Sequence, residues 1–435
     1  MHSDEDIDAR GRLARHLGEL MERRGHSRQT LADATGYKRP QISEAIAGKQ
    51  IPSANLIRSL ERVLSTRGEL ISMWKDAKLE DLARSLDEEL PGIPRAREGD
   101  TTDRREVVEL GVLTVAAGLA GEVSRRIAGG DPDPLTLDEL DERLDQIGAV
   151  YTMTPHTTLA PLIISGWQDT ERQLDSRLSS RVRARLTLVA GQFAFYGGRL
   201  AFNLGDDAAA RRFASLAELY ARDANDPLLT GSVATLQTSI AYYTGRHTSA
   251  AEIAAQARVG AHPYLRARLA AYEARARAAA GQHDQARQAL RDMQEAVWVG
   301  EPMVGTEPFG EELMHTFVAV VSGRLGDGEQ AEPHARRALA ILQTTGGGYE
   351  DIGGTYNALA QAHLRRRHPD PEQAADAATA ALAVLEGRPT RTVIQRTGQI
   401  WQELGARWEG QRAVVELGDR LQDHRRALPA GSSSG

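Results

Sequence analysis

Residues 27–53 read SRQTLADATGYKRPQISEAIAGKQIPS, and this stretch predicts two short helices joined by a tight turn. Ser27 is a favourable N-cap for a first helix that carries Leu31 and Ala32. Gly36 follows that helix, and glycine can turn the chain because it lacks a Cβ atom. The pattern therefore predicts a short helix that begins after Ser27 and carries Leu31, Ala32 and Ala34, followed by a change of direction at Gly36.

A second helix is predicted over residues 38–47. Ile42, Ala45 and Ile46 lie at the i, i+3, i+4 spacing of a packed helix face. Two helices this close in the chain must cross sharply, and the small side chain of Ala32 lets them meet. The second helix can then stand out far enough to enter a DNA major groove, which is roughly 12 Å wide.

The wider pattern resembles the Cro/repressor (XRE) type of helix-turn-helix domain over residues 9–65. The residues that carry the resemblance are Leu31, Ala32, Gly36, Ile42, Ser43, Gly48, Lys49 and Pro52. A first amphipathic helix carries Leu13, Leu17, Leu20 and Met21, and a fourth, begun by Ser53, carries Leu56, Ile57, Leu60, Val63 and Leu64. We expect a fifth helix from Arg67 to about Leu86.

This resemblance implies that the N-terminal domain binds double-stranded DNA. The family's base-reading positions fall on Arg39, Pro40 and Glu44, and its phosphate-contacting positions on Arg28, Lys38, Gln41 and Lys49. Ser43 lies on the same solvent-facing or DNA-facing side of the second helix. Pro40 departs from the family pattern, which usually has a polar residue there, although proline is tolerated in the first turn of a helix.

The distribution of charge is consistent with a DNA-binding N-terminus. Residues 9–67 carry a net charge of +7, whereas the whole chain carries −7 and the part after Arg67 carries −10. A basic module ahead of an acidic body suits a protein whose N-terminal part meets phosphate groups.

Composition sets the class of protein and its compartment. The 435 residues are enough for two or three domains, and an apolar fraction of 41% supports packed cores. The chain has no cysteine, and residues 3–8 are mostly acidic where a secretory signal would be basic and then apolar. We expect a cytoplasmic protein.

The sequence divides into a helix-turn-helix domain (9–88), a linker with a connecting helix (89–134), a helical-repeat domain (135–428) and a disordered tail (429–435). Residues 91–103 are rich in Pro, Gly and charge, as an exposed linker would be. The uncharged run at 110–121 is too short for a bilayer span of about 20 residues, so we expect a buried helix over about 103–128 and no membrane partner.

The region after residue 134 contains an internal repeat. Helices end in Gly-centred turns near Gly205, Gly245, Gly281 and Gly326, spaced 40, 36 and 45 residues apart, and weaker units follow near His368 and Gly405. In each unit the first helix carries large residues and the second is rich in alanine, which lets stacked hairpins share one core. This resembles the tetratricopeptide repeat (TPR), and it predicts an α-solenoid of helical hairpins.

Such a superhelix presents a concave groove lined by the first helix of each hairpin. A signalling peptide, a small ligand or a partner protein could bind there. The candidate contacts are Gln192, Asn203, Gln237, Tyr242, Glu273, His315, Asn357 and Gln361.

No catalytic or metal-binding pattern is present in the sequence. There is no HExxH motif, P-loop or nucleophile elbow, so we expect neither an enzyme nor a cofactor. Both halves together resemble the helix-turn-helix regulators with TPR sensor domains, including peptide-responsive quorum-sensing receptors of Gram-positive bacteria and related actinobacterial regulators. The resemblance implies a homodimer that reads two half-sites about 34 Å apart. The alternative is a TPR interaction scaffold whose helix-turn-helix no longer binds DNA, as Pro40 would favour.

Overall fold

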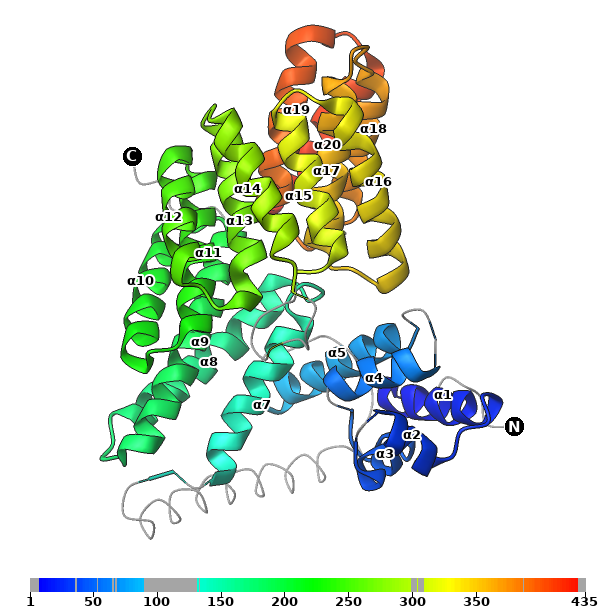
Figure 1. The fold of residues 1–435 in the computed structure, drawn as a ribbon, viewed down its shortest axis with the longest axis vertical. Helices are drawn as coiled ribbons and strands as arrows, with labels where there is room; N and C mark the ends of the chain where they lie inside the picture. The colour runs from blue at the N-terminus through cyan, green and yellow to red at the C-terminus, as the bar shows by residue number, and fades with distance from the viewer. Residues whose placement is uncertain are drawn as a thin grey trace, which may run out of the picture.

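The structure is a computed structural model, and all regular secondary structure in the part of the chain that it describes is α-helical. It describes residues 8–35, 37–52, 54–64, 66, 69–89, 131–132, 134–298, 303, 309–385 and 387–428. Within these ranges nineteen helices form a small N-terminal head and a large curved body (Figure 1). The predicted all-α fold is confirmed. Gly36, Ser53, the expected linker and connecting helix, and the tail at 429–435 lie outside the described residues.

The head contains five helices around one apolar core. They are α1 (Ala9–Arg23), α2 (Arg28–Thr35), α3 (Arg39–Ile46), α4 (Ala54–Leu64) and α5 (Glu69–Glu89). Leu17, Leu31, Ile42 and Leu60 are fully buried in this core, where the predicted apolar stripes place them.

Specific hydrogen bonds fix how the helices of the head begin and join. The Thr30 amide donates to Ser27 Oγ at 3.1 Å, which confirms Ser27 as the N-cap of α2. The indole Nε1 of Trp74 on α5 donates to the Pro52 carbonyl at 2.7 Å, and the Ala9 amide donates to Glu80 at 2.7 Å. These two hydrogen bonds connect α5 to α1 and to the segment before α4.

The body is a series of antiparallel helix pairs that follow two leading helices, α7 (Pro134–Val150) and α8 (His156–Leu174). The pairs are α9 (Ser180–Leu204) with α10 (Asp207–Ala224), α11 (Pro227–Tyr243) with α12 (His247–Gly260), α13 (Pro263–Ala279) with α14 (His283–Glu295), α15 (Glu311–Arg324) with α16 (Gly328–Thr345), α17 (Tyr349–Arg365) with α18 (Pro371–Ala383), and α19 (Arg391–Trp408) with α20 (Arg412–Ala427). The predicted solenoid of TPR-like hairpins is confirmed.

The turns inside the first four pairs use the glycines that the sequence repeat contains. Gly205, Gly245, Gly281 and Gly326 have φ angles between 74° and 90°, in the left-handed region that side chains with a Cβ atom avoid. The prediction of a turn at Gly405 was wrong, because α19 continues through that residue to Trp408. An adjacent Glu-Gly pair at 409–410 ends that helix instead.

Alternation of small and large side chains explains why the pairs stack. In α10 the buried side chains are four alanines, and α16 buries Ala331, Ala335 and Ala338. The first helices bury bulky residues such as Phe193 and Tyr243. Backbones can therefore approach closely on one side while rings fill the space on the other.

The body curls back on itself, so that the last pair contacts the first two, which the sequence analysis did not predict. Arg391 at the start of α19 forms an ion pair with Asp207 at the start of α10. Gln395 on α19 donates from Nε2 to the Tyr243 carbonyl at 3.1 Å. On the same side, Tyr349 of α17 is hydrogen-bonded to His156 of α8. These bonds join the two ends of the described repeat array.

The head contacts the body through α5, which packs on α7 and also contacts α16. Helices α5 and α7 pack together, and Ala149 of α7 lies against the head core (Figure 1). Helix α7 also packs on α9, the first helix of the repeat array. Burial at this junction lowers the pKa of Lys78, and the nearby carboxylates of Asp81 and Glu142 oppose that shift.

In the part of the chain that the structure covers, every helix is too short or too polar to cross a membrane.

Candidate DNA interface and ligand pocket

Helix α3 has one buried face and one exposed face. Ile42 and Ala45 are buried against α2, with exposures of 0% and 4%. The predicted DNA-contacting residues all lie at the start of α2, on α3 or in the turn after it. Arg28, Lys38, Arg39, Pro40, Gln41, Glu44 and Lys49 are exposed and Ser43 is half-buried.

The first turn of α3 accommodates Pro40 without loss of a hydrogen bond. Pro40 is the second residue of α3, where the backbone amide has no partner within the helix. The Lys38 amide donates to Gln41 Oε1 at 3.1 Å and so caps the same turn. Pro40 is therefore compatible with an intact α3, and the side chain of Gln41 is held at the N-terminal end of this helix.

The turn after α3 places Lys49 beside the C-terminal end of that helix. Gly48 has a φ angle of 65°, and the Lys49 amide donates to the Glu44 carbonyl at 3.1 Å. This is the hydrogen bond of a Schellman C-cap. A Cβ atom on Gly48 would also lie 3.2 Å from the Cβ atom of Ala14, so the turn is packed against α1.

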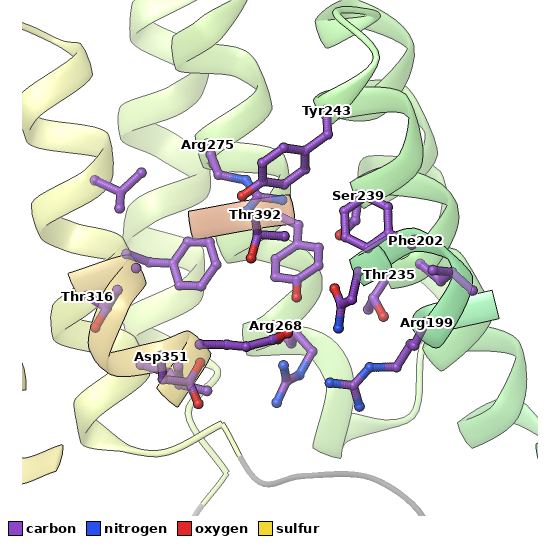
Figure 2. Close-up of a pocket in the computed structure, with 18 of the residues that line it drawn as sticks. Arg199, Phe202, Thr235, Ser239, Tyr243, Arg268, Arg275, Thr316, Asp351 and Thr392 are labelled. Carbon is purple, nitrogen blue, oxygen red and sulfur yellow. The ribbon is translucent and has the colours of Figure 1, made fainter. Parts of the chain in front are cut away.

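The body contains a pocket lined by the first helix of every pair. Residues of α9, α11, α13, α15, α17 and α19 surround about 1080 Å³ of space, which includes its opening to solvent (Figure 2). The predicted location of a groove on the first helices agrees with this arrangement. Because the repeat array curls back on itself, α19 also lines the pocket, through Thr392 and Arg396.

Of the eight groove residues proposed from sequence, Asn203 lines this pocket and the other seven lie elsewhere. Gln237 donates to Glu218 on α10 at 2.8 Å, and Asn357 donates to the Val393 carbonyl at 3.1 Å. Glu273 pairs with Arg258 and Arg277. His315 contacts His334, Tyr242 is 5% exposed, and Gln192 and Gln361 are half-buried.

The pocket instead combines arginines with aromatic rings. Its lining contains four guanidinium groups, those of Arg199, Arg268, Arg275 and Arg396, and two carboxylates, Glu350 and Asp351. Its aromatic lining consists of Phe195, Phe202, Tyr243, Tyr272 and Phe317. These arginines are not among the residues predicted from sequence, although Arg268 and Arg275 are seven residues apart and therefore share a helix face.

Of the two carboxylates, Glu350 is the one whose charge interacts with Arg199. Burial raises the pKa of Glu350, but His156, Arg199 and a hydrogen bond from Thr390 outweigh it and hold that pKa below its ordinary value. Glu350 is therefore ionised at neutral pH. The pocket has a net charge of +2 when all six groups are charged.

Comparison with known proteins supports the interpretation of the head as a helix-turn-helix. Residues 12–73, from the first turn of α1 into α5, match the family model of a helix-turn-helix domain. This match indicates a DNA-binding regulator. No curated protein sequence matches the chain.

Two solved structures have a weak overall similarity to the chain. One is the crystal structure of Rap protein complexed with competence and sporulation factor, with 12% identity and a TM-score of 0.47 over 95% of this chain and 99% of that chain. The other is the APC/C hetero-tetramer Cut9–Hcn1, with 11% identity and a TM-score of 0.20 over 97% of each chain.

Proposed function

We propose that the protein is a sequence-specific transcriptional regulator that binds DNA as a homodimer and responds to a ligand in the pocket of its body. The observation that carries this proposal is a helix-turn-helix head in contact, through α5 and α7, with a body whose pocket touches all six helix pairs.

The proposed DNA contacts follow from the exposed face of α3. Arg39 and Glu44 would read base edges, with Pro40 and Ser43 against the groove wall. Arg28, Lys38, Gln41 and Lys49 would bind phosphates. An arginine can donate two hydrogen bonds to a guanine, so Arg39 is expected to contribute most to sequence preference.

The proposed response to ligand follows from the packing between pocket and head. A ligand that contacts α9 and α19 biases how tightly the array curls, and α9 packs on α7, which packs on α5. Two heads bind two half-sites well only when the bodies hold the correct spacing. A ligand that binds one curvature of the body more tightly than another would then change the affinity of the protein for DNA. The coupling free energy between ligand binding and DNA binding would be about 1–3 kcal/mol.

The test is selection of genomic DNA fragments on the purified full-length protein. Wild type should enrich one palindromic site, and Arg39→Ala should bind DNA with a relaxed sequence preference. Enrichment of no fragment, together with a co-purifying protein partner, would favour the interaction scaffold instead. A single half-site would refute the homodimer but leave DNA reading intact.

A further inference from the structure

Arg275 is a buried cation without a counter-ion in the described part of the chain. The residue is only 5% exposed, and its Nε and Nη2 atoms have no hydrogen-bond partner among the described residues. It nevertheless lines the pocket. Figure 2 shows its side chain beside the ring of Tyr243, at the opposite end of the pocket from Arg268 and Asp351.

Aromatic rings surround this guanidinium group. Its central carbon lies 4.3 Å from the ring centroid of Tyr242, 4.7 Å from that of Tyr272, and 5.6 Å from those of Tyr243 and Phe317. Cation–π contacts of this kind offset part of the cost of burial. A ring face does not accept hydrogen bonds from N–H groups that lie in the guanidinium plane, so these contacts leave the Nε and Nη2 groups without an acceptor.

Arginine cannot escape this cost by losing its proton, because the guanidinium group stays protonated in proteins. A buried charge without a partner is strongly unfavourable, and proteins normally pair such a group. The arrangement therefore implies an acceptor that is not part of the described chain and that reaches Arg275 through the pocket.

Nearby groups also favour an anion at this position. The hydroxyl of Tyr242, whose ring lies against Arg275, is also buried without a hydrogen-bond partner among the described residues, although Tyr242 does not line the pocket. Arg324 lies 5.6 Å from the Tyr242 ring centroid. Burial lowers the pKa of His247, and the positive charges of Arg324 and Arg275 lower it further, as expected where positive charge is uncompensated.

We infer that the pocket binds an organic carboxylate, whose charged end pairs with Arg275 and whose apolar body lies among the aromatic side chains. The planar fork of a guanidinium group matches the two oxygens of a carboxylate. Phe202, Tyr243 and Phe317 supply apolar walls. This inference rests on the ligand-binding half of the proposed function and gives that ligand a chemical class.

The first experiment uses acetate as the smallest carboxylate probe. Thermal unfolding of the full-length protein is measured in sodium acetate, sodium chloride and sodium phosphate at equal ionic strength. Acetate should raise the melting temperature of wild type relative to chloride. Phosphate stabilisation without acetate stabilisation would overturn the choice of carboxylate, and stabilisation by neither anion would overturn the site.

Variants assign the effect to Arg275. Arg275→Met should lose the acetate response and should melt higher than wild type in chloride, because an unpaired buried charge is replaced by an apolar side chain. Arg275→Lys keeps the charge without the fork and should respond to acetate less than wild type does. Arg222→Met, on the outer helix α10 where the side chain is 70% exposed, is the matched control and should respond as wild type. A full acetate response in Arg275→Met would refute the inference.

Calorimetry with larger probes identifies the source of the carboxylate. The probes are 3-phenylpropionate, an apolar tripeptide with a free C-terminus, and the same tripeptide amidated at its C-terminus. The amide should bind at least about tenfold more weakly than the acid, since it loses a charged hydrogen bond. Equal binding of acid and amide would overturn the role of Arg275. Tighter binding of either acid shows which class of compound supplies the group.

The selection of DNA fragments separates this inference from the proposed function. Arg275→Met should enrich the same DNA site as wild type, because Arg275 lies in the body. Acetate binding by a protein that enriches no DNA would leave the carboxylate site standing and refute the regulator. DNA enrichment by a protein that shows no response to carboxylates would refute the carboxylate site and leave the regulator standing.

Discussion

Lys49 offers a quantitative test of how the head meets DNA. It is exposed, it follows the Gly48 turn, and its backbone is fixed by the hydrogen bond to Glu44. If its ammonium group binds a phosphate, Lys49→Ala removes one phosphate contact per head without removing any buried packing. Its effect should therefore be electrostatic and independent of DNA sequence.

The magnitude follows from counterion release. Each phosphate neutralised on B-DNA contributes about 0.9 to the slope of log K against log salt concentration. A homodimer loses two contacts, so Lys49→Ala should flatten the slope by about 1.8, against about 0.9 for a single head. When the salt concentration rises from 50 to 200 mM, the DNA affinity of the wild type should fall by a factor about twelve times larger than that of the variant. This factor is calculated from the slope difference of about 1.8 for a dimer.

The assay is fluorescence anisotropy with the selected DNA site and with an unrelated duplex, over a series of salt concentrations. Arg412→Ala is the control, because it removes a guanidinium group that is 91% exposed on α20 of the body. The control should leave the slope unchanged. An unchanged slope in Lys49→Ala would refute the phosphate contact, and a loss confined to the selected site would mean that Lys49 reads bases.

Three further predictions concern the stability of the body. Gly328→Ala should lower the free energy of unfolding by about 3 kcal/mol or more in urea titrations, because the new Cβ atom would overlap backbone atoms of Ala362 and Arg366. Gly260→Ala is the control, since its Cβ atom would meet open space, and it should change the free energy of unfolding little. Asp207→Asn leaves Arg391 without its carboxylate and should cost about 1–3 kcal/mol, and an unchanged urea midpoint would show that this bond does not hold the array closed. Burial and the charge of Arg366 hold the pKa of His363 below its ordinary 6.5, so its contribution to stability is complete above pH 6.5 and is lost as the pH falls through the lowered pKa. Melting curves between pH 7.5 and 5 should show a smaller acid loss in His363→Gln than in wild type.

Local patterns account for the features that the sequence predicted correctly. Ser27 caps α2 through a bond to Thr30, three residues away, and Ile42 and Ala45 are buried because their spacing matches one helix turn. The glycine turns at Gly205 and Gly326 depend on backbone conformation at single residues. Each of these features involves contacts within a few residues and is visible in the sequence itself.

The pocket could not be predicted residue by residue, because its composition depends on which face of each helix turns inward. Gln237 and Asn357 lie on first helices, but they point at neighbouring helices and bond there. Arg268 and Arg275 resemble ordinary solvated charges in a chain with 53 lysines and arginines. The joint between Arg391 and Asp207 links residues 184 positions apart, and it depends on curvature accumulated over the whole array.

The bond between α19 and the start of the array changes how the body can respond to force or heat. In an open repeat protein the terminal units fray first, and each unit unfolds nearly independently of distant ones. Here Arg391 and Gln395 hold the last pair on the first two, so the described array has no loose end at this joint. The body should therefore unfold as one cooperative unit, and a ligand that changes its curvature must also strain or shift that joint.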